Sequence, residues 1–164
     1  MNDNTYDRSN GGDLYRTIIE TVKDMITVWD MNLSLIYVSP SVEHILGYSE
    51  KEFKHLFNNH GESGFNHVIT PNAMNTFRDT ITKRIQEYEK LDTSERQRPV
   101  ELELVRKDGS AIWTETKNSF LRNSDGERTG FFSITRDISE RKHTREMLLK
   151  SEERYRNILE SIED

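Results

Sequence analysis

Short runs in which apolar and polar residues alternate predict the strands of this chain. Val100–Leu104 alternates strictly, which is the period of a half-buried strand. The turn-forming runs Lys107–Ser110 and Asn123–Gly126 join it to two further strands, as in consecutive antiparallel hairpins. The five predicted strands are Ile26–Asp30, Leu35–Ser39, Val100–Leu104, Ala111 to about Leu121, and Gly130–Thr135.

Apolar residues at three- or four-residue spacing predict a long helix that opens at Thr70-Pro71. Its apolar face consists of Met74, Phe77, Ile81, Ile85, Tyr88 and Leu91. Before it, Ser39-Pro40 is expected to be the N-cap and first position of a short helix that ends at Gly47. Ser49 and Glu52 have capping-box spacing for one further turn, and the polar, glycine-containing run 58–66 is expected to be a loop.

The two ends of the chain have related sequences. Tyr15–Asp24 recurs as Tyr155–Asp164, with Tyr, Arg, Ile, Glu and Asp at matching positions. The repeat predicts a tail over residues 1–12, one domain over residues 13–137, and a connector helix over residues 138–164 that leads into a second module. Convergence of two short charged helices is the alternative.

Composition narrows the classes of function. The chain has 164 residues, 32% of them charged, and a net charge of −6, which argues against a surface that neutralises nucleic-acid phosphates. It contains no cysteine and no apolar run long enough for a membrane span, so disulfides and thiolate chemistry are excluded and a cytoplasmic setting is expected.

Three stretches carry a resemblance to a known family. They are ITVWDMNLSLIYVSPSVEHILGYSEKEF, then RKDGSAIWTETKNSFLRNSDGERTGFFSITRDISERK, and finally SEERYRNILESIED. The first two resemble the halves of a PAS domain with its PAC motif, and the third is similar to the start of a following PAS repeat. The resemblance implies an α+β fold, with a five-stranded antiparallel sheet in the order 2-1-5-4-3 and helices on one face. It also implies a sensory role in a multidomain signalling protein, most often a histidine kinase.

The resemblance also bears on cofactors. Photosensory relatives form a cysteine–flavin bond, which this chain cannot make because it has no cysteine. At the positions where those relatives have amide side chains that contact the flavin, this chain has Leu104, Thr114 and Thr135. Haem-binding relatives often offer a histidine from the long helix, but residues 72–91 contain none, and His67 lies just before them. The remaining histidines lack metal-site spacing, so we expect no metal, no haem, and either no ligand or an unknown small molecule.

A small-molecule cavity between the sheet and the long helix remains possible. Alternate residues of a strand share a face, so the last two strands present polar side chains to the core if they are oriented as in relatives. The candidate ligand-binding residues are Phe77, Ile81, Thr114, Thr116, Asn118, Phe131, Ser133 and Thr135. The alternative is that these polar atoms bond to neighbouring backbone and that the helix simply fills the core.

The expected signal relay consists of Trp113 in the fourth strand and of Asp137 and Glu140, which follow the last strand. Asp137 and Glu140 have capping-box spacing at the strand-to-helix junction. Beyond it, Leu148, Tyr155 and Ile162 recur every seven residues. Near the other end, Asp13 is expected to be the N-cap of an N-terminal helix with Leu14, Ile18, Val22 and Met25 on one face. The apolar residues of these two flanking helices predict a homodimer through them.

No catalytic motif is present. We therefore expect a non-catalytic module that senses a small ligand or relays a conformational signal to downstream domains of the same chain, such as a histidine kinase. Two alternatives remain open: a dimerisation scaffold without a ligand, and a redox or gas sensor with non-covalent flavin or haem.

Overall fold

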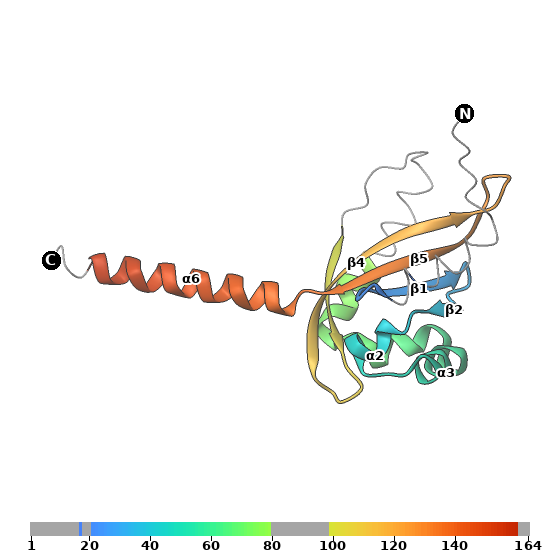
Figure 1. Ribbon diagram of the computed structural model, residues 1–164, viewed down its shortest axis with the longest axis horizontal. Helices are drawn as coiled ribbons and strands as arrows, with labels where there is room; N and C mark the ends of the chain where they lie inside the picture. The colour runs from blue at the N-terminus through green and yellow to red at the C-terminus, as the bar shows by residue number, and fades with distance from the viewer. Residues whose placement is uncertain (1–16, 18–20, 80–98, 161–164) are drawn as a thin grey trace.

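A single antiparallel sheet organises the protein. The computed structural model describes residue 17, residues 21–79 and residues 99–160. Within these residues the five strands follow the order β2-β1-β5-β4-β3, as Figure 1 shows. The strands are β1 (Met25–Asp30), β2 (Leu35–Val38), β3 (Val100–Val105), β4 (Ala111–Arg122) and β5 (Arg128–Asp137). The predicted α+β class and strand order are confirmed.

Short helices connect β2 to β3, and one long helix follows β5. The elements between the strands are α2 (Ser41–Leu46), α3 (Glu50–His60), the 3-10 helix η1 (Gly61–Gly64), α4 (Phe65–Val68) and a helical segment over residues 71–79. Figure 1 shows α2 and α3 beside the sheet, whereas α6 (Ser139–Glu160) extends away from the rest of the molecule.

The alternation in the strands decides which side chains meet the helices. In β1, Met25, Thr27 and Trp29 are buried, while the residues between them are half-buried. Strand register places these three opposite Thr135, Ser133 and Phe131 of β5. The inner face of the sheet is therefore built from odd-numbered positions of β1 and β5, because successive side chains of a strand point to opposite faces.

The region between β2 and β3 is more helical than the sequence predicts. The capping box at Ser49 and Glu52 is confirmed, but the helix that it opens has 11 residues instead of a single turn. The run 58–66, predicted as a loop, contains the end of α3, all of η1 and the start of α4. Phe57 and Phe65 explain the difference, because each ring packs on Trp29 and tertiary contact outweighs the local loop signal.

The N-cap predicted for the helix after β2 is wrong by one residue. Pro40 is the N-cap of α2. The Ser39 hydroxyl instead accepts a hydrogen bond from the Ile26 amide at 2.8 Å, which joins the end of β2 to β1. A long-range partner thus outcompetes the local one.

Several predictions lie outside the described residues. These are the N-terminal tail and most of the N-terminal helix, the part of the long helix that carries Ile81, and residues 161–164. The connector helix predicted over residues 138–164 is described over Ser139–Glu160.

Gly130 offers a test of how closely β1 and β5 approach each other. A Cβ atom at this position would lie 2.2 Å from the Trp29 carbonyl oxygen. The backbone would have to move to relieve this contact. We expect Gly130→Ala to lower the free energy of unfolding by about 2 kcal/mol or more, the cost of overpacking a tight site. Urea unfolding measures it.

The neighbouring Thr129→Ala is the matched control, because Thr129 is exposed. Its cost should stay below about 1 kcal/mol, the span of strand propensities. Equal effects of the two substitutions would contradict the close approach.

Candidate ligand cavity and exit-helix junction

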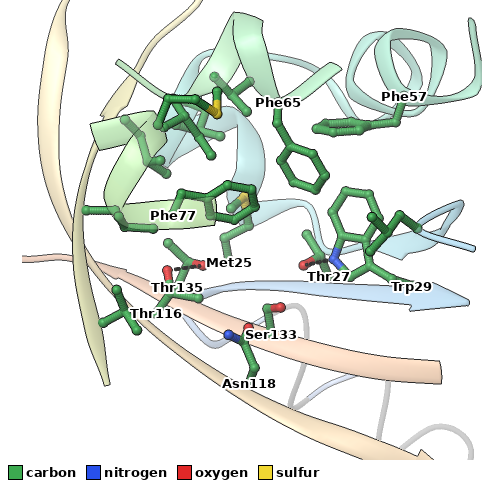
Figure 2. Close-up of a pocket in the computed structure, with 18 of the residues that line it drawn as sticks. Met25, Thr27, Trp29, Phe57, Phe65, Phe77, Thr116, Asn118, Ser133 and Thr135 are labelled. Atoms are coloured by element: carbon green, nitrogen blue, oxygen red, sulfur yellow. Dashed lines mark hydrogen bonds between the residues drawn. The ribbon is translucent and has the colours of Figure 1, made fainter. Parts of the chain in front are cut away.

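A cavity of about 550 Å³ lies between the inner face of the sheet and the helices (Figure 2). This volume is within the range of small-molecule sites in proteins. Strands β1, β3, β4 and β5 contribute one wall, and helices α3 and α4 with residues 71–79 contribute the other. The wall is aromatic over much of its area, with side chains from Trp29, Phe53, Phe57, Phe65, Phe77 and Phe131.

The aromatic part of the cavity is centred on Trp29, which is 4% exposed. Its ring meets Phe57 edge-on, with centroids 4.8 Å apart, and lies 5.3 Å from Phe65. Phe131, its partner across β1 and β5, is nearly parallel to it at 15° with centroids 6.3 Å apart. Rings at these distances attract one another beyond simple burial, so this end of the cavity is a fixed apolar surface.

The other part of the sheet wall is polar. Register aligns Thr27, Ser133 and Asn118 in one row across β1, β5 and β4. Thr116 and Thr135 form the next row, and their hydroxyls are 3.0 Å apart in a hydrogen bond. The Thr27 hydroxyl accepts a hydrogen bond from the Trp29 indole nitrogen at 2.8 Å. Three of the five polar side chains are therefore hydrogen-bonded inside the protein.

Ser133 and Asn118 differ from their neighbours. Within the part of the chain that the structure describes, neither the Ser133 hydroxyl nor the Asn118 amide has a hydrogen-bond partner. Ser133 is only 7% exposed. A buried polar group without a partner is costly, so this pair is the point in the cavity at which a polar ligand atom would be most favoured.

Most of the predicted ligand-binding residues meet at this cavity. Its described lining includes Phe77, Thr116, Asn118, Phe131, Ser133 and Thr135. Thr114 is fully buried but does not line the cavity, because its hydroxyl donates to the Leu102 carbonyl on β3 at 2.9 Å. Ile81 lies outside the described residues.

Sequence reasoning missed the residues of β1 and of the short helices, namely Thr27, Trp29, Phe57 and Phe65. Alternation within β1 already places Thr27 and Trp29 on one face, so these two could have been found from the sequence. Phe65 could not, because the run 58–66 was expected to be a loop, and Phe57 could not, because it lies beyond the single helical turn predicted at Ser49 and Glu52.

Trp113 and Asp137 hold the start of α6 against the sheet. The Trp113 carbonyl accepts from the Ile138 amide at 2.8 Å, and the Trp113 amide donates to the Ser139 hydroxyl at 3.1 Å. One oxygen of the Asp137 carboxylate accepts from the Ser139 amide at 2.8 Å, and the other accepts from Arg106 at 3.2 Å. Arg106 also donates to the Ile45 carbonyl at the end of α2. The junction thus joins β4, β5, α2 and α6.

The capping box predicted between Asp137 and Glu140 does not form. Asp137 bonds the amide two residues further on, that of Ser139, and the exposed Glu140 has no hydrogen-bond partner among the described residues. The reason is that Ile138 is buried, at 3% exposure, and its amide pairs with Trp113 of β4. The helix therefore starts at Ser139, one residue later than it would if Asp137 were its N-cap.

A cluster of charges reinforces the junction on the outer face of the sheet. Glu101 of β3 pairs with Arg141 at 3.1 Å and with Lys142, while Arg141 also reaches Glu115 of β4. The Lys142 ammonium lies over the Trp113 ring, 4.2 Å from its centroid. The hydrogen bond from Lys142 lowers the pKa of Glu101, so the carboxylate keeps its charge to a lower pH than an ordinary glutamate does.

The described residues contain neither a metal-binding cluster nor a membrane-spanning helix. No group of three or more His, Asp or Glu side chains is arranged there to hold a metal ion. None of the helices in these residues has both the length and the apolar character needed to cross a membrane.

The sheet order, the helices on one face and the cavity between them define a class of protein: single-sheet α+β modules with a cavity of ligand size. The PAS family model, described as the PAS fold, matches residues 13–138. The chain therefore belongs to the PAS family. No curated protein matches its sequence.

Solved structures with this fold include a PAS domain from Colwellia psychrerythraea, with a TM-score of 0.59 and 19% identity over 78% of this chain and 97% of the other. A sensory box histidine kinase/response regulator from Burkholderia thailandensis has a TM-score of 0.58 and 18% identity over 87% and 98%. A domain of a sensory box sensor histidine kinase/response regulator from Geobacter sulfurreducens has a TM-score of 0.56 and 19% identity over 81% and 99%. At these identities the likeness establishes the fold.

The role of Asp137 at the junction can be measured by substitution. Asp137→Ala removes the acceptor for the Ser139 amide and the partner of Arg106, so we expect a loss of about 1 kcal/mol in unfolding free energy, the usual cost of a removed cap. Thermal unfolding and helix content by circular dichroism are the measurements. Asp137→Asn keeps an acceptor oxygen and should lose less. An alanine variant that matches the parent in both would rule out the capping role.

Proposed function

We propose that this chain is a non-catalytic sensory PAS module that binds a small molecule in the cavity and relays its presence through α6 to a downstream domain of the same polypeptide. The observation that carries this proposal is that the same two strands serve both tasks. Thr116 and Asn118 of β4 and Ser133 and Thr135 of β5 line the cavity, and the ends of these strands hold α6.

A change at the polar wall has a short route to the helix. Thr135 is two residues before Asp137 in β5, and Thr116, its hydrogen-bond partner, is three residues after Trp113 in β4. A ligand that competes for these hydroxyls would alter the pairing of β4 and β5 next to the bonds that fix α6. Such a differential contact is what a ligand needs in order to shift a conformational equilibrium.

The cavity lining bears on haem and on a covalently bound flavin, and leaves a non-covalent flavin as an alternative ligand. The described lining contains neither histidine nor cysteine, so it offers no imidazole for haem iron and no thiol for a flavin adduct. We propose a small molecule held without a covalent bond.

The proposed output domain is a histidine kinase. Two of the three similar structures reported above carry that description in their names. The recurrence of Tyr15–Asp24 at Tyr155–Asp164 supports a second PAS copy between this module and the output. A cytoplasmic setting, expected from the absence of cysteine, remains a prediction.

We also propose that the module forms a homodimer through α6. Such a dimer does not require a ligand in the cavity. The helix contacts the body of the protein near its first turn and extends away from it (Figure 1). Leu148 and Tyr155 are 60% and 67% exposed at seven-residue spacing, and Ile158 extends this face. A second copy is the partner that such a repeat fits, because two identical helices pair along it.

Filling the cavity tests the relay independently of any ligand. We expect Ser133→Leu, which places an apolar side chain where a ligand would lie, to change amide hydrogen exchange in the first turn of α6 by at least about threefold, because local opening there depends on the β4 and β5 contacts. Exchange is followed by mass spectrometry of the peptides that cover residues 137–143.

Ser119→Leu is the matched control, since Ser119 pairs with Phe132 of β5 in register and points to the face of β4 opposite to that of Asn118. It should leave exchange in α6 unchanged. If Ser133→Leu folds and exchange in α6 is the same as in the parent, the relay is refuted.

The dimer is tested by sedimentation of the wild type and of Leu148→Glu over a range of concentrations. We expect the substitution to weaken association at least about tenfold, because it places a charge in an apolar contact. Leu149→Glu is the control, as Leu149 is similarly exposed but lies about 100° further round the helix. A wild type that remains monomeric refutes the dimer, and equal effects of the two variants refute the surface.

A further inference from the structure

We infer that the cavity takes an uncharged, planar aromatic compound that carries an amide-like group, with Asn118 and Ser133 as the residues that bind this group. The inference rests on the proposed ligand-binding function and adds the chemical class of the ligand. Three features of the described lining support it: the lack of buried charge, the two polar side chains without a partner, and the aromatic side chains beside them.

The lining argues for an uncharged ligand. Arg78 is the only charged side chain among the described lining residues, and it is exposed at the edge of the cavity. A carboxylate or phosphate that entered beside Ser133 would lose its hydration without gaining an opposite charge, which is costly in a buried site. An uncharged polar group has no such cost.

The unpaired side chains specify what the polar group must offer. An asparagine amide has both a donor and an acceptor, and a serine hydroxyl can serve as either. The two residues are directly opposite each other across β4 and β5, so their polar atoms face the same region of the cavity, as Figure 2 shows. Their neighbours Thr116 and Thr135 already bond to each other, and Thr27 bonds to Trp29. A group with a donor and an acceptor on one edge, such as a carboxamide or a cyclic amide, complements Asn118 and Ser133 together.

The aromatic surface begins next to this polar pair. Phe131 is two residues from Ser133 on the same face of β5, and Trp29 is its partner on β1. Their ring planes lie within 15° of parallel with centroids 6.3 Å apart, and Phe65, which also contacts Trp29, meets Phe77 on the helical wall with centroids 5.0 Å apart. A planar ring system attached to the amide edge would lie against these rings, in the geometry that aromatic pairs prefer.

A matched set of three compounds tests the class: 2-naphthamide, 2-naphthoate and 2-methylnaphthalene. They share one ring system and differ in whether the substituent is an amide, a carboxylate or a methyl group. Each is titrated into the nitrogen-15-labelled protein at neutral pH, and the indole N–H resonance of Trp29 reports binding, since its nitrogen lies in the cavity wall. Trp113, on the opposite face of the sheet, supplies the second indole signal.

We expect 2-naphthamide to shift the Trp29 resonance with a dissociation constant at least about tenfold below those of the other two compounds, a ratio that one well-made polar contact supplies. Asn118→Leu and the smaller change Ser133→Ala should each reduce this preference by at least about threefold while 2-methylnaphthalene binds as before. Retained binding of the hydrocarbon also shows that each variant folds.

Several outcomes overturn the inference. Tighter or equal binding of 2-naphthoate or 2-methylnaphthalene refutes the amide class, and a preference for 2-naphthamide that survives both substitutions refutes the two residues. A failure of all three to move the Trp29 resonance, or a shift of Trp113 alone, refutes aromatic binding in the cavity. None of these results depends on hydrogen exchange in α6, so the ligand class and the relay can fail separately.

Discussion

The structure depends on the position of the Trp29 indole. Its ring lies on the inner face of the sheet and contacts Phe57 of α3, Phe65 of α4 and Phe131 of β5, and so joins three segments that are distant in sequence. The hydrogen bond to Thr27 fixes the orientation of the ring. Gly130 lets β5 approach the Trp29 backbone closely. Without these contacts, the short helices would have little reason to cover the sheet, because helices of this length are marginal alone.

The aromatic cluster also explains why the core contains a cavity. Large rings hold the helices at a distance from one half of the sheet, while small polar side chains occupy the other half. Thr27, Thr116, Ser133 and Thr135 are too short to reach the helical wall, so space remains between the layers. A larger apolar side chain at any of these positions would fill part of that space. The cavity therefore follows from residue size as much as from the fold.

The exit helix is attached through the backbone as well as through side chains. The amide and carbonyl of Trp113 both bond to the segment that starts α6, and Asp137 links that segment to Arg106. The outer charges of Glu101, Arg141 and Lys142 add a second set of contacts. A helix held at one end and extended elsewhere is suited to transmit small displacements of the sheet, because its direction is set by its first turn.

The sequence by itself determined the strands and which residues of β4 and β5 share a face, while the strand order and the face that points inward were implied by the resemblance to the PAS family. Alternation and turn residues are local signals, and the PAS resemblance covers residues in the correct order. It also determined most of the candidate cavity residues, since Thr116, Asn118, Ser133 and Thr135 follow from the two-residue period of a strand. The capping box at Ser49 is local too, and it was predicted correctly.

Tertiary structure alone decided the rest. Phe65 lies in a helix and packs on Trp29, although its local sequence is typical of a loop, and Phe57 packs on Trp29 from a helix longer than the single turn predicted. Thr114 bonds to β3 instead of lining the cavity, and Ile138 rather than Asp137 precedes the first residue of α6, because partners distant in sequence satisfy these groups. Neighbours from other strands likewise decide which polar side chains of the cavity remain without a partner. Among the described residues these are Asn118 and Ser133. The physical reason is that a hydrogen bond or ring contact between distant residues has no signature in the local pattern of either one.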